Sequence, residues 1–168
     1  MSIALAFMAV VSSAWITPHR SEEGKSPESV IAAVYDVISG PAGQKRDWER
    51  MRSLFAPNAT LTAIGKGRDG KVRRQVLTVE DYIKLSGPYL EEKGFFETEI
   101  ASRSEKFRDL VHVWSTYESR SKKEDKPFAR GINSFQLWND GTRWYVLSIV
   151  WQEEDAQNPI PEKYVGKG

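Results

Sequence analysis

The second half of this chain consists almost entirely of long segments with the composition of β-strands, and no other feature limits the fold as much. These segments are rich in aromatic and β-branched residues, which strands favour, and they span residues 96–107, 110–120, 130–138 and 143–153. Their connections are short, and Asn139-Asp140-Gly141-Thr142 is a hairpin signal. Long sequential strands joined by tight turns predict an antiparallel meander.

The first half of the sequence has the signals of helices. Ser26-Pro27-Glu28 offers a capping residue, a proline and an acid at a helix start, and apolar residues then recur at helical spacing up to Gly40-Pro41. A shorter helix is predicted over 47–55, and a hairpin over 61–77. Thr78 to Asp81 resembles a capping box that opens a third helix, which we expect Gly87-Pro88 to disrupt.

Helices that come first and strands that follow indicate the α+β class rather than alternating βαβ units. We therefore predict a curved antiparallel sheet with three N-terminal helical segments packed over its concave face, leaving a cone-shaped pocket. The predicted domain spans residues 26–154, a length typical of one domain. Residues 155–168, with Asn158-Pro159-Ile160-Pro161, are predicted to be an irregular tail.

Residues 1–25 have features of a targeting signal. The apolar run 2–15 has about the length of a signal-peptide core and is too short for a membrane span, which needs about 20 apolar residues. No basic segment precedes it, so we interpret 1–25 as a signal peptide or a hydrophobic extension, followed by a linker up to Lys25. We expect export to the periplasm or the medium, with a cytoplasmic location as the alternative, and no stable membrane insertion after processing.

Composition excludes several kinds of chemistry. The sequence has no cysteine, which rules out disulfides, thiolate zinc sites and cysteine nucleophiles. Its net charge is +1, from 24 Lys+Arg against 23 Asp+Glu, so no nucleic-acid partner is expected. Six tryptophans suit either a thick core or an aromatic-lined cavity.

Three phrases in this order resemble the nuclear transport factor 2-like superfamily, specifically its SnoaL-like bacterial branch. They are Leu54-Phe55-Ala56-Pro57-Asn58-Ala59, the strand phrase from Val111 to Glu118, and Asn139-Asp140-Gly141 leading to Trp144-Tyr145-Val146-Leu147. The resemblance covers about residues 26–154 and implies a cystatin-like roll with a cavity. It also implies a homodimer formed through the outer face of the sheet. It does not imply one function, because this superfamily contains enzymes and binding domains alike.

His112 is the candidate catalytic residue. It lies mid-strand, in phase with Trp114, and an imidazole that faced the cavity could act as a general base near neutral pH. The alternative is a histidine on the outer face or at a dimer interface. Tyr35 at the pocket edge, Trp48 and Trp114 are the further candidates for the pocket wall.

Asn133 and Ser148 are the candidate polar residues of the pocket. A two-residue turn at Asp140-Gly141 would place them opposite each other among apolar neighbours, and buried polar groups need partners or a ligand. A three-residue loop with a glycine bulge is also compatible with this turn and would shift the register by one.

Glu97, Glu99 and Glu105 share one strand parity, which is typical of a solvated strand face. A single strand histidine does not make a metal site, so no metal and no cofactor are expected. We predict a small-molecule-binding or accessory domain with an apolar, aromatic-lined pocket whose partner is a small apolar molecule. One alternative is a SnoaL-like cyclase, isomerase or dehydratase that uses general acid/base catalysis, and another is a structural dimerisation module.

Overall fold

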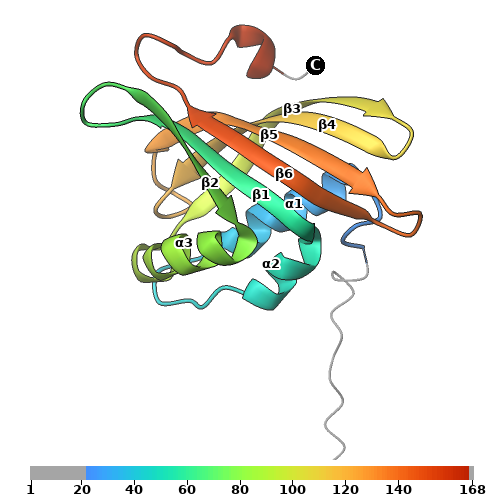
Figure 1. Cartoon of the computed structure of the whole chain (residues 1–168). Coiled ribbons are helices and arrows are strands. Elements are labelled where there is room, and N and C mark those ends of the chain that lie inside the picture. Colours follow the sequence, from blue (N-terminus) through green and yellow to red (C-terminus); the bar gives the residue numbers. More distant parts are fainter. Residues whose placement is uncertain (1–21, 167–168) are drawn as a thin grey trace, which may run out of the picture.

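A computed structural model describes residues 22–166 of the chain, and its helices cover one face of a curved sheet (Figure 1). The elements follow the order α1 (Pro27–Ile38), α2 (Trp48–Leu54), β1 (Phe55–Lys66), β2 (Val72–Thr78), α3 (Val79–Lys93), β3 (Phe96–Phe107), β4 (Leu110–Arg120), β5 (Ala129–Asn139), β6 (Trp144–Glu153) and the 3-10 helix η2 (Glu162–Tyr164). The predicted α+β class is therefore confirmed. The apolar run on which the predicted signal peptide rests lies outside the described residues.

Side chains cap all three helices, and those of α1 and α3 lie at the expected positions. Ser26 and Ser29 form a reciprocal capping box at α1, and Asp47 accepts a hydrogen bond from the Arg50 amide at α2. Thr78 and Asp81 form the second capping box at α3. These bonds satisfy backbone N–H groups that a helix start leaves unpaired.

Helix α3 does not stop at Gly87-Pro88, as we expected, but continues through Pro88 to Lys93. A proline inside a helix removes one backbone hydrogen bond and leaves the carbonyl four residues earlier without it. Pro88 and Lys84 are both exposed, so water can satisfy that carbonyl. The extra turn brings Leu90 into the core, while Tyr89 stays exposed beside it.

The six strands form one sheet in the order β2-β1-β6-β5-β4-β3. Neighbouring strands run antiparallel, as predicted, except for β1 and β6, which pair in parallel. The hairpin β1–β2 thus lies beside β6, the last strand of the meander, although the chain runs from β2 through α3 to β3, the first strand. The local sequence pattern does not show this pairing. The sheet is mixed and not closed into a barrel, and it curves around α1 (Figure 1).

The concave face of the sheet and the inner sides of the helices form the hydrophobic core. Strand side chains alternate between the two faces, and in β4 the inward-facing buried residues are Val111, Val113, Ser115, Tyr117 and Ser119. Thr116 is also buried, on the outer face. Helix α1 contributes the largest helical share of the core, with seven buried residues from Val30 to Ile38.

The chain segment after β6 lies on the opposite, outer face of the sheet (Figure 1). Residues 155–166 have only an isolated bridge between Asp155 and Asn158 and the helix η2. The Tyr164 ring packs on Trp114 with centroids 5.7 Å apart, and the Tyr164 carbonyl accepts a hydrogen bond from Thr116. This tail therefore covers part of the outer face.

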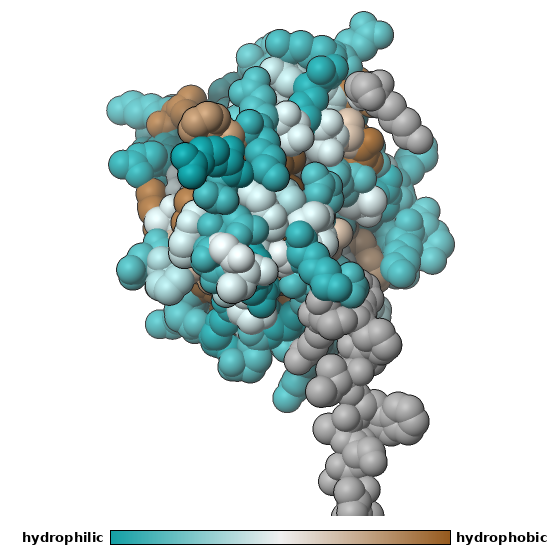
Figure 2. Space-filling model, turned by 90° about the vertical axis from the view of Figure 1, so that its right-hand side faces the viewer, coloured by the Kyte–Doolittle hydropathy of each residue, from teal (hydrophilic) through white to brown (hydrophobic). Residues whose placement is uncertain are grey.

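Residues 22–25, which we expected to belong to a linker, are attached to the fold. The Glu23 carboxylate pairs with Arg50 at 2.6 Å, and the Gly24 carbonyl accepts a hydrogen bond from the Trp144 amide. The side of the molecule shown in Figure 2 is mostly hydrophilic, with hydrophobic side chains in separate patches. No helix within residues 22–166 combines the length and apolar character needed to span a bilayer.

Arg46 connects the ends of two helices from a buried position, with only 6% of its surface exposed. Its guanidinium donates to the carbonyls of Ile38 at the end of α1, Gly40 just beyond it, and Leu90 in α3. Gly40 in turn exchanges two backbone hydrogen bonds with Phe95, which leads into β3. One side chain thus ties α1, α3 and the start of the meander together.

We predict that Arg46→Met lowers the free energy of unfolding by about 3 kcal/mol, because buried carbonyls lose their donors. Urea denaturation followed by circular dichroism measures the change. The matched control is Arg52→Met, since Arg52 forms surface ion pairs with Glu49 and Glu80, and this substitution should lower the free energy of unfolding by less than about 1 kcal/mol. Equal losses in the two variants would contradict the connecting role of Arg46.

Candidate functional site

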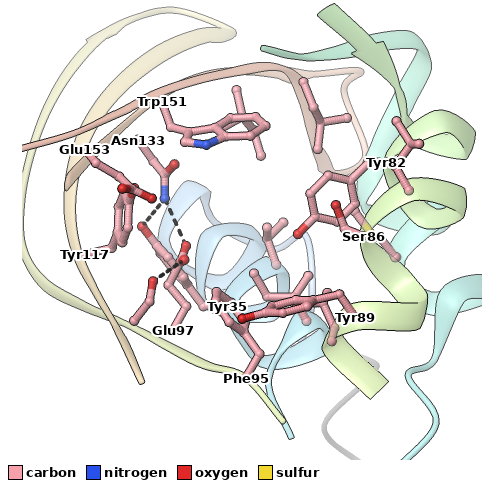
Figure 3. A pocket seen from close by; sticks show the side chains of 18 of the residues that line it. Tyr35, Tyr82, Ser86, Tyr89, Phe95, Glu97, Tyr117, Asn133, Trp151 and Glu153 are labelled. Atoms are coloured by element: carbon pink, nitrogen blue, oxygen red, sulfur yellow. Dashed lines mark hydrogen bonds between the residues drawn. The ribbon is translucent and has the colours of Figure 1, made fainter. Parts of the chain in front are cut away.

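A cavity of about 360 Å³ lies between the concave face of the sheet and helices α1 and α3 (Figure 3). Its wall is mostly apolar and aromatic, which is typical of sites for small molecules. The lining residues are Val34, Tyr35, Ile38, Met51, Leu61, Tyr82, Leu85, Ser86, Tyr89, Leu90, Phe95, Glu97, Tyr117, Ser119, Phe128, Asn133, Phe135, Ile149, Trp151 and Glu153.

The polar side chains of this cavity gather mainly on the side formed by the sheet and α1, opposite α3 (Figure 3). The Asn133 amide nitrogen donates to Glu97 Oε1 at 3.2 Å and to the Tyr35 hydroxyl at 3.0 Å. The Ser119 hydroxyl donates to Glu97 Oε2 at 2.9 Å. Both oxygens of the Glu97 carboxyl group therefore have a neutral donor.

A directed chain of hydrogen bonds continues from Asn133 away from the cavity. The Ser115 hydroxyl donates to Glu99 at 2.5 Å, so its single proton is used there. The Tyr35 hydroxyl, 2.6 Å from Ser115 Oγ, must then donate to it. Asn133, Tyr35 and Ser115 thus each have a fixed donor direction, which holds the Asn133 amide in one orientation.

Burial raises the pKa of the Glu97 carboxyl from 4.5 to about 7. Removal from water disfavours the charged form and is the largest cause. The hydrogen bonds from Ser119 and Asn133 act against it, and the negative charge of Glu153 adds to it. Glu97 is therefore divided between its neutral and its charged form near neutral pH, as a general acid or base requires.

The Tyr35 hydroxyl has a raised pKa, first because of burial and second because of the nearby charge of Glu97. Tyr82 and Tyr117 have raised pKa values for the same two reasons. All three phenols consequently keep their protons at physiological pH. They can act as hydrogen-bond donors but not as bases.

Glu97 is the residue that sequence reasoning missed, because we interpreted the row of acids in β3 as a solvated face. The expectation failed at a β-bulge: Glu99 pairs with Tyr117 but Ala101 pairs with Thr116, so Ile100 is an extra residue. The bulge reverses the strand parity. Glu97 therefore points into the cavity, whereas Glu105 is exposed opposite His112 on the outer face.

His112 does not line the cavity. It lies on the outer face of the sheet, 3.0 Å from the Ser134 hydroxyl and edge-on to Trp114. Strand alternation is the reason, since Val111, Val113 and Ser115 take the inward positions of β4. This placement corrects the idea of a His112 general base in the pocket, and Trp114 likewise packs on Tyr164 outside it.

Tyr35 and Asn133 line the cavity, but Ser148 does not. Asn139 pairs with Trp144, so four residues form the turn, and Leu147 is an extra residue in β6. Neither turn considered from the sequence has this register. Asn133 consequently lies opposite Trp151, while Ser148 pairs with Gln136 on the outer side.

Trp48 packs against the core from α2 without reaching the cavity wall. Its indole nitrogen donates to Glu91 at 3.2 Å. Within residues 22–166, no group of three or more His, Asp or Glu side chains is arranged to hold a metal ion. The chemistry that this site offers therefore comes from one carboxyl group of raised pKa, an oriented amide and several hydroxyls.

Comparisons with known proteins identify the fold. No family model matches the sequence, and no curated protein matches it. A protein of unknown function with a cystatin-like fold from Nostoc punctiforme superimposes with a TM-score of 0.56 at 12% identity, over 77% of this chain and 89% of the other.

Two further solved structures are similar. A nuclear transport factor 2-like protein of unknown function from Silicibacter pomeroyi gives a TM-score of 0.51 at 12% identity, over 76% and 92% of the two chains. A protein of unknown function from Mycobacterium tuberculosis gives 0.58 at 12% identity, over 79% and 72%. This chain has the nuclear transport factor 2-like, cystatin-like fold, as its sequence phrases indicated.

We predict that Glu97→Gln changes the pH dependence of stability. Below about pH 4.5 the carboxyl group is mainly protonated in both the folded and the unfolded chain. As the pH rises from 4.5 to 7, the carboxyl group ionises first in the unfolded chain, so the free energy of unfolding of the wild type falls. The fall reaches up to about 3 kcal/mol, which corresponds to a pKa raised from 4.5 to about 7. The loss is complete above that pKa.

The Glu97→Gln variant lacks this loss. Its free energy of unfolding should therefore increase relative to that of the wild type between about pH 5 and pH 8. Urea denaturation at several pH values measures it. Glu105→Gln is the matched control on the exposed face of the same strand. Parallel curves for wild type and Glu97→Gln would contradict the raised pKa.

Proposed function

We propose that this protein binds a small, mostly apolar molecule in the cavity between the sheet and α3. The observation that carries the proposal is a cavity of about 360 Å³ whose aromatic wall contains one localised polar cluster. The wall supplies apolar contact area, and the cluster around Glu97 and Asn133 orients the ligand. Sites for small molecules combine these two features.

The rim of the cavity supports the same proposal. Leu85, Tyr89 and Phe128 line the cavity, yet 57%, 54% and 56% of their surfaces are exposed. Large apolar side chains are seldom gathered at the surface without a partner. A ligand that enters between α3 and the sheet would contact all three.

We predict that the neutral dye N-phenyl-1-naphthylamine binds the wild type with enhanced fluorescence and that Ser86→Trp weakens binding about tenfold or more. Ser86 is half-buried on α3 and points into the cavity (Figure 3), so an indole there fills space that the dye needs. A tenfold loss corresponds to about 1.4 kcal/mol. Fluorescence titration measures the affinity.

Ser53→Trp is the control, because Ser53 is exposed on α2 and is not among the residues that line the cavity. It should bind the dye as the wild type does. If the wild type did not bind the dye, or if both variants bound it equally, the cavity would not be the binding site.

A second candidate function is general acid/base catalysis of the SnoaL-like kind, as in a cyclase, isomerase or dehydratase without a cofactor. The raised pKa of Glu97 favours it, and Glu97 replaces His112 as the candidate base. The two Asn133 N–H groups and the Tyr35 proton are already used within the cluster. A substrate carbonyl would therefore need another donor, such as a tyrosine hydroxyl of the wall.

For this second function we predict that the wild type accelerates exchange of the α-protons of 2-tetralone in D₂O and that Glu97→Gln slows this exchange about 100-fold or more. Nuclear magnetic resonance follows the exchange. His112→Gln, on the outer face, should keep the wild-type rate. No acceleration by the wild type, or equal rates for Glu97→Gln, would count against catalysis.

Homodimer formation through the outer face and export remain proposals. The dimerisation module is the less favoured alternative, because Tyr164 and its neighbours in the tail already cover Trp114 and Thr116 on that face. The proposal of export rests on the apolar run in residues 2–15 of the sequence.

A further inference from the structure

The cavity wall carries negative charge without a positive partner. Glu97 and Glu153 are the carboxyl groups that line it, and none of its lining residues in the described part of the chain is Lys, Arg or His. Other carboxylates of the fold are paired with cations: Glu23 with Arg50, Glu118 with Arg120 and Arg130, and Glu154 with Arg130. Within residues 22–166, neither the half-buried Glu97 nor the exposed Glu153 forms such an ion pair.

The hydrogen-bonding capacity that remains in the polar cluster is mainly that of acceptors. Asn133 uses both N–H groups on Glu97 and Tyr35, and Ser119 uses its proton on Glu97. Within residues 22–166, neither Asn133 Oδ1 nor the Glu153 carboxylate accepts a hydrogen bond from another side chain. A ligand group that donates hydrogen bonds therefore fits these acceptors.

Aromatic rings surround the same space. Trp151, Tyr117 and Tyr35 lie on the side of the polar cluster, and Tyr82 and Tyr89 face them from α3 (Figure 3). The faces of such rings attract an ammonium group through their quadrupole, most strongly where water is excluded. Rings, unpaired carboxylates and free acceptors all favour the same kind of ligand group.

We propose that the ligand of this cavity is an organic amine, with an ammonium group at Glu97, Glu153 and Asn133 Oδ1 and an apolar body against the aromatic wall. This inference rests on the proposed binding function and names its ligand class. A neutral alcohol or hydrocarbon of the same shape would fill the cavity but would leave the carboxylates without a counter-charge.

Binding of an amine in this cavity is coupled to the release of a proton. An ammonium group beside Glu97 favours the ionised carboxylate, and burial otherwise raises the pKa of Glu97 to about 7. Binding near neutral pH must therefore release a proton, and the affinity for the amine must increase as the pH rises through 7. The affinity for a neutral isostere must not increase in this range.

The test compares 2-(2-naphthyl)ethylamine with 2-(2-naphthyl)ethanol, which differ in one charged group. The full chain is titrated with each probe in competition with N-phenyl-1-naphthylamine at about pH 6 and pH 8. We expect the affinity for the amine to be at least about tenfold higher than the affinity for the alcohol at the higher pH. Calorimetry of the amine in two buffers of different ionisation enthalpy measures proton release.

Variants assign the effect to the two carboxylates. Circular dichroism first shows whether each variant is folded. Glu97→Gln and, independently, Glu153→Gln should each lower the affinity for the amine about tenfold and change the affinity for the alcohol little. Glu105→Gln on the outer face should change neither affinity. Two variants keep the test valid should one of them not fold.

The outcomes separate this inference from the proposed function. Equal affinities for the two probes, tighter binding of the alcohol, or an amine affinity that does not change with pH would overturn the inference and leave a neutral-ligand site. Binding of the dye without binding of the amine would do the same. Failure of the dye, the amine and the alcohol to bind would overturn both proposals.

Discussion

The buried guanidinium of Arg46 is the contact on which the arrangement of the helices depends. It donates to carbonyls of α1, of Gly40 beyond α1, and of α3, so it fixes the position of α3 relative to the end of α1. Apolar packing alone would tend to close the gap between α3 and the sheet, because interiors favour close packing. A fixed, directional cluster of hydrogen bonds can hold α3 in place while the space beside it stays open as a cavity.

The second constraint is the β-bulge at Ile100 in β3. Glu97 and Glu105 are an even number of residues apart in β3, yet Glu97, before the bulge, faces inward and Glu105, after it, faces outward. A strand without the bulge could keep Glu97 inward only by changing the pairing of the residues that follow. Burying an unpaired carboxylate costs several kcal/mol, and this fold meets part of that cost with neutral donors from Ser119 and Asn133. Such a costly group is more easily explained by function than by stability.

The sequence was sufficient for features that depend on local pattern. Capping residues marked the starts of α1 and α3, and β-branched and aromatic runs marked the strands. It was insufficient where the structure depends on a register that local pattern does not encode. The bulges at Ile100 and Leu147 carry no Gly or Pro signal, and they decided the facing of Glu97 and Ser148. The parallel pairing of β1 with β6 is non-local, and α3 tolerates Pro88 because that side faces solvent.

The hydrogen-bond donors that the cluster leaves free help to decide between binding and catalysis. An enzyme that stabilises a developing oxyanion needs donors preorganised towards the substrate. Here the Asn133 N–H groups and the Tyr35 proton point at protein acceptors, and the groups that this cluster leaves for a ligand are carboxylate and amide oxygens, while the remaining donors of the wall are hydroxyls such as those of Tyr82 and Tyr117. Such a site is complementary to positive rather than negative charge. The same Glu97 that resembles a catalytic base by its pKa is thus better placed, by its neighbours, as a counter-charge for a bound cation.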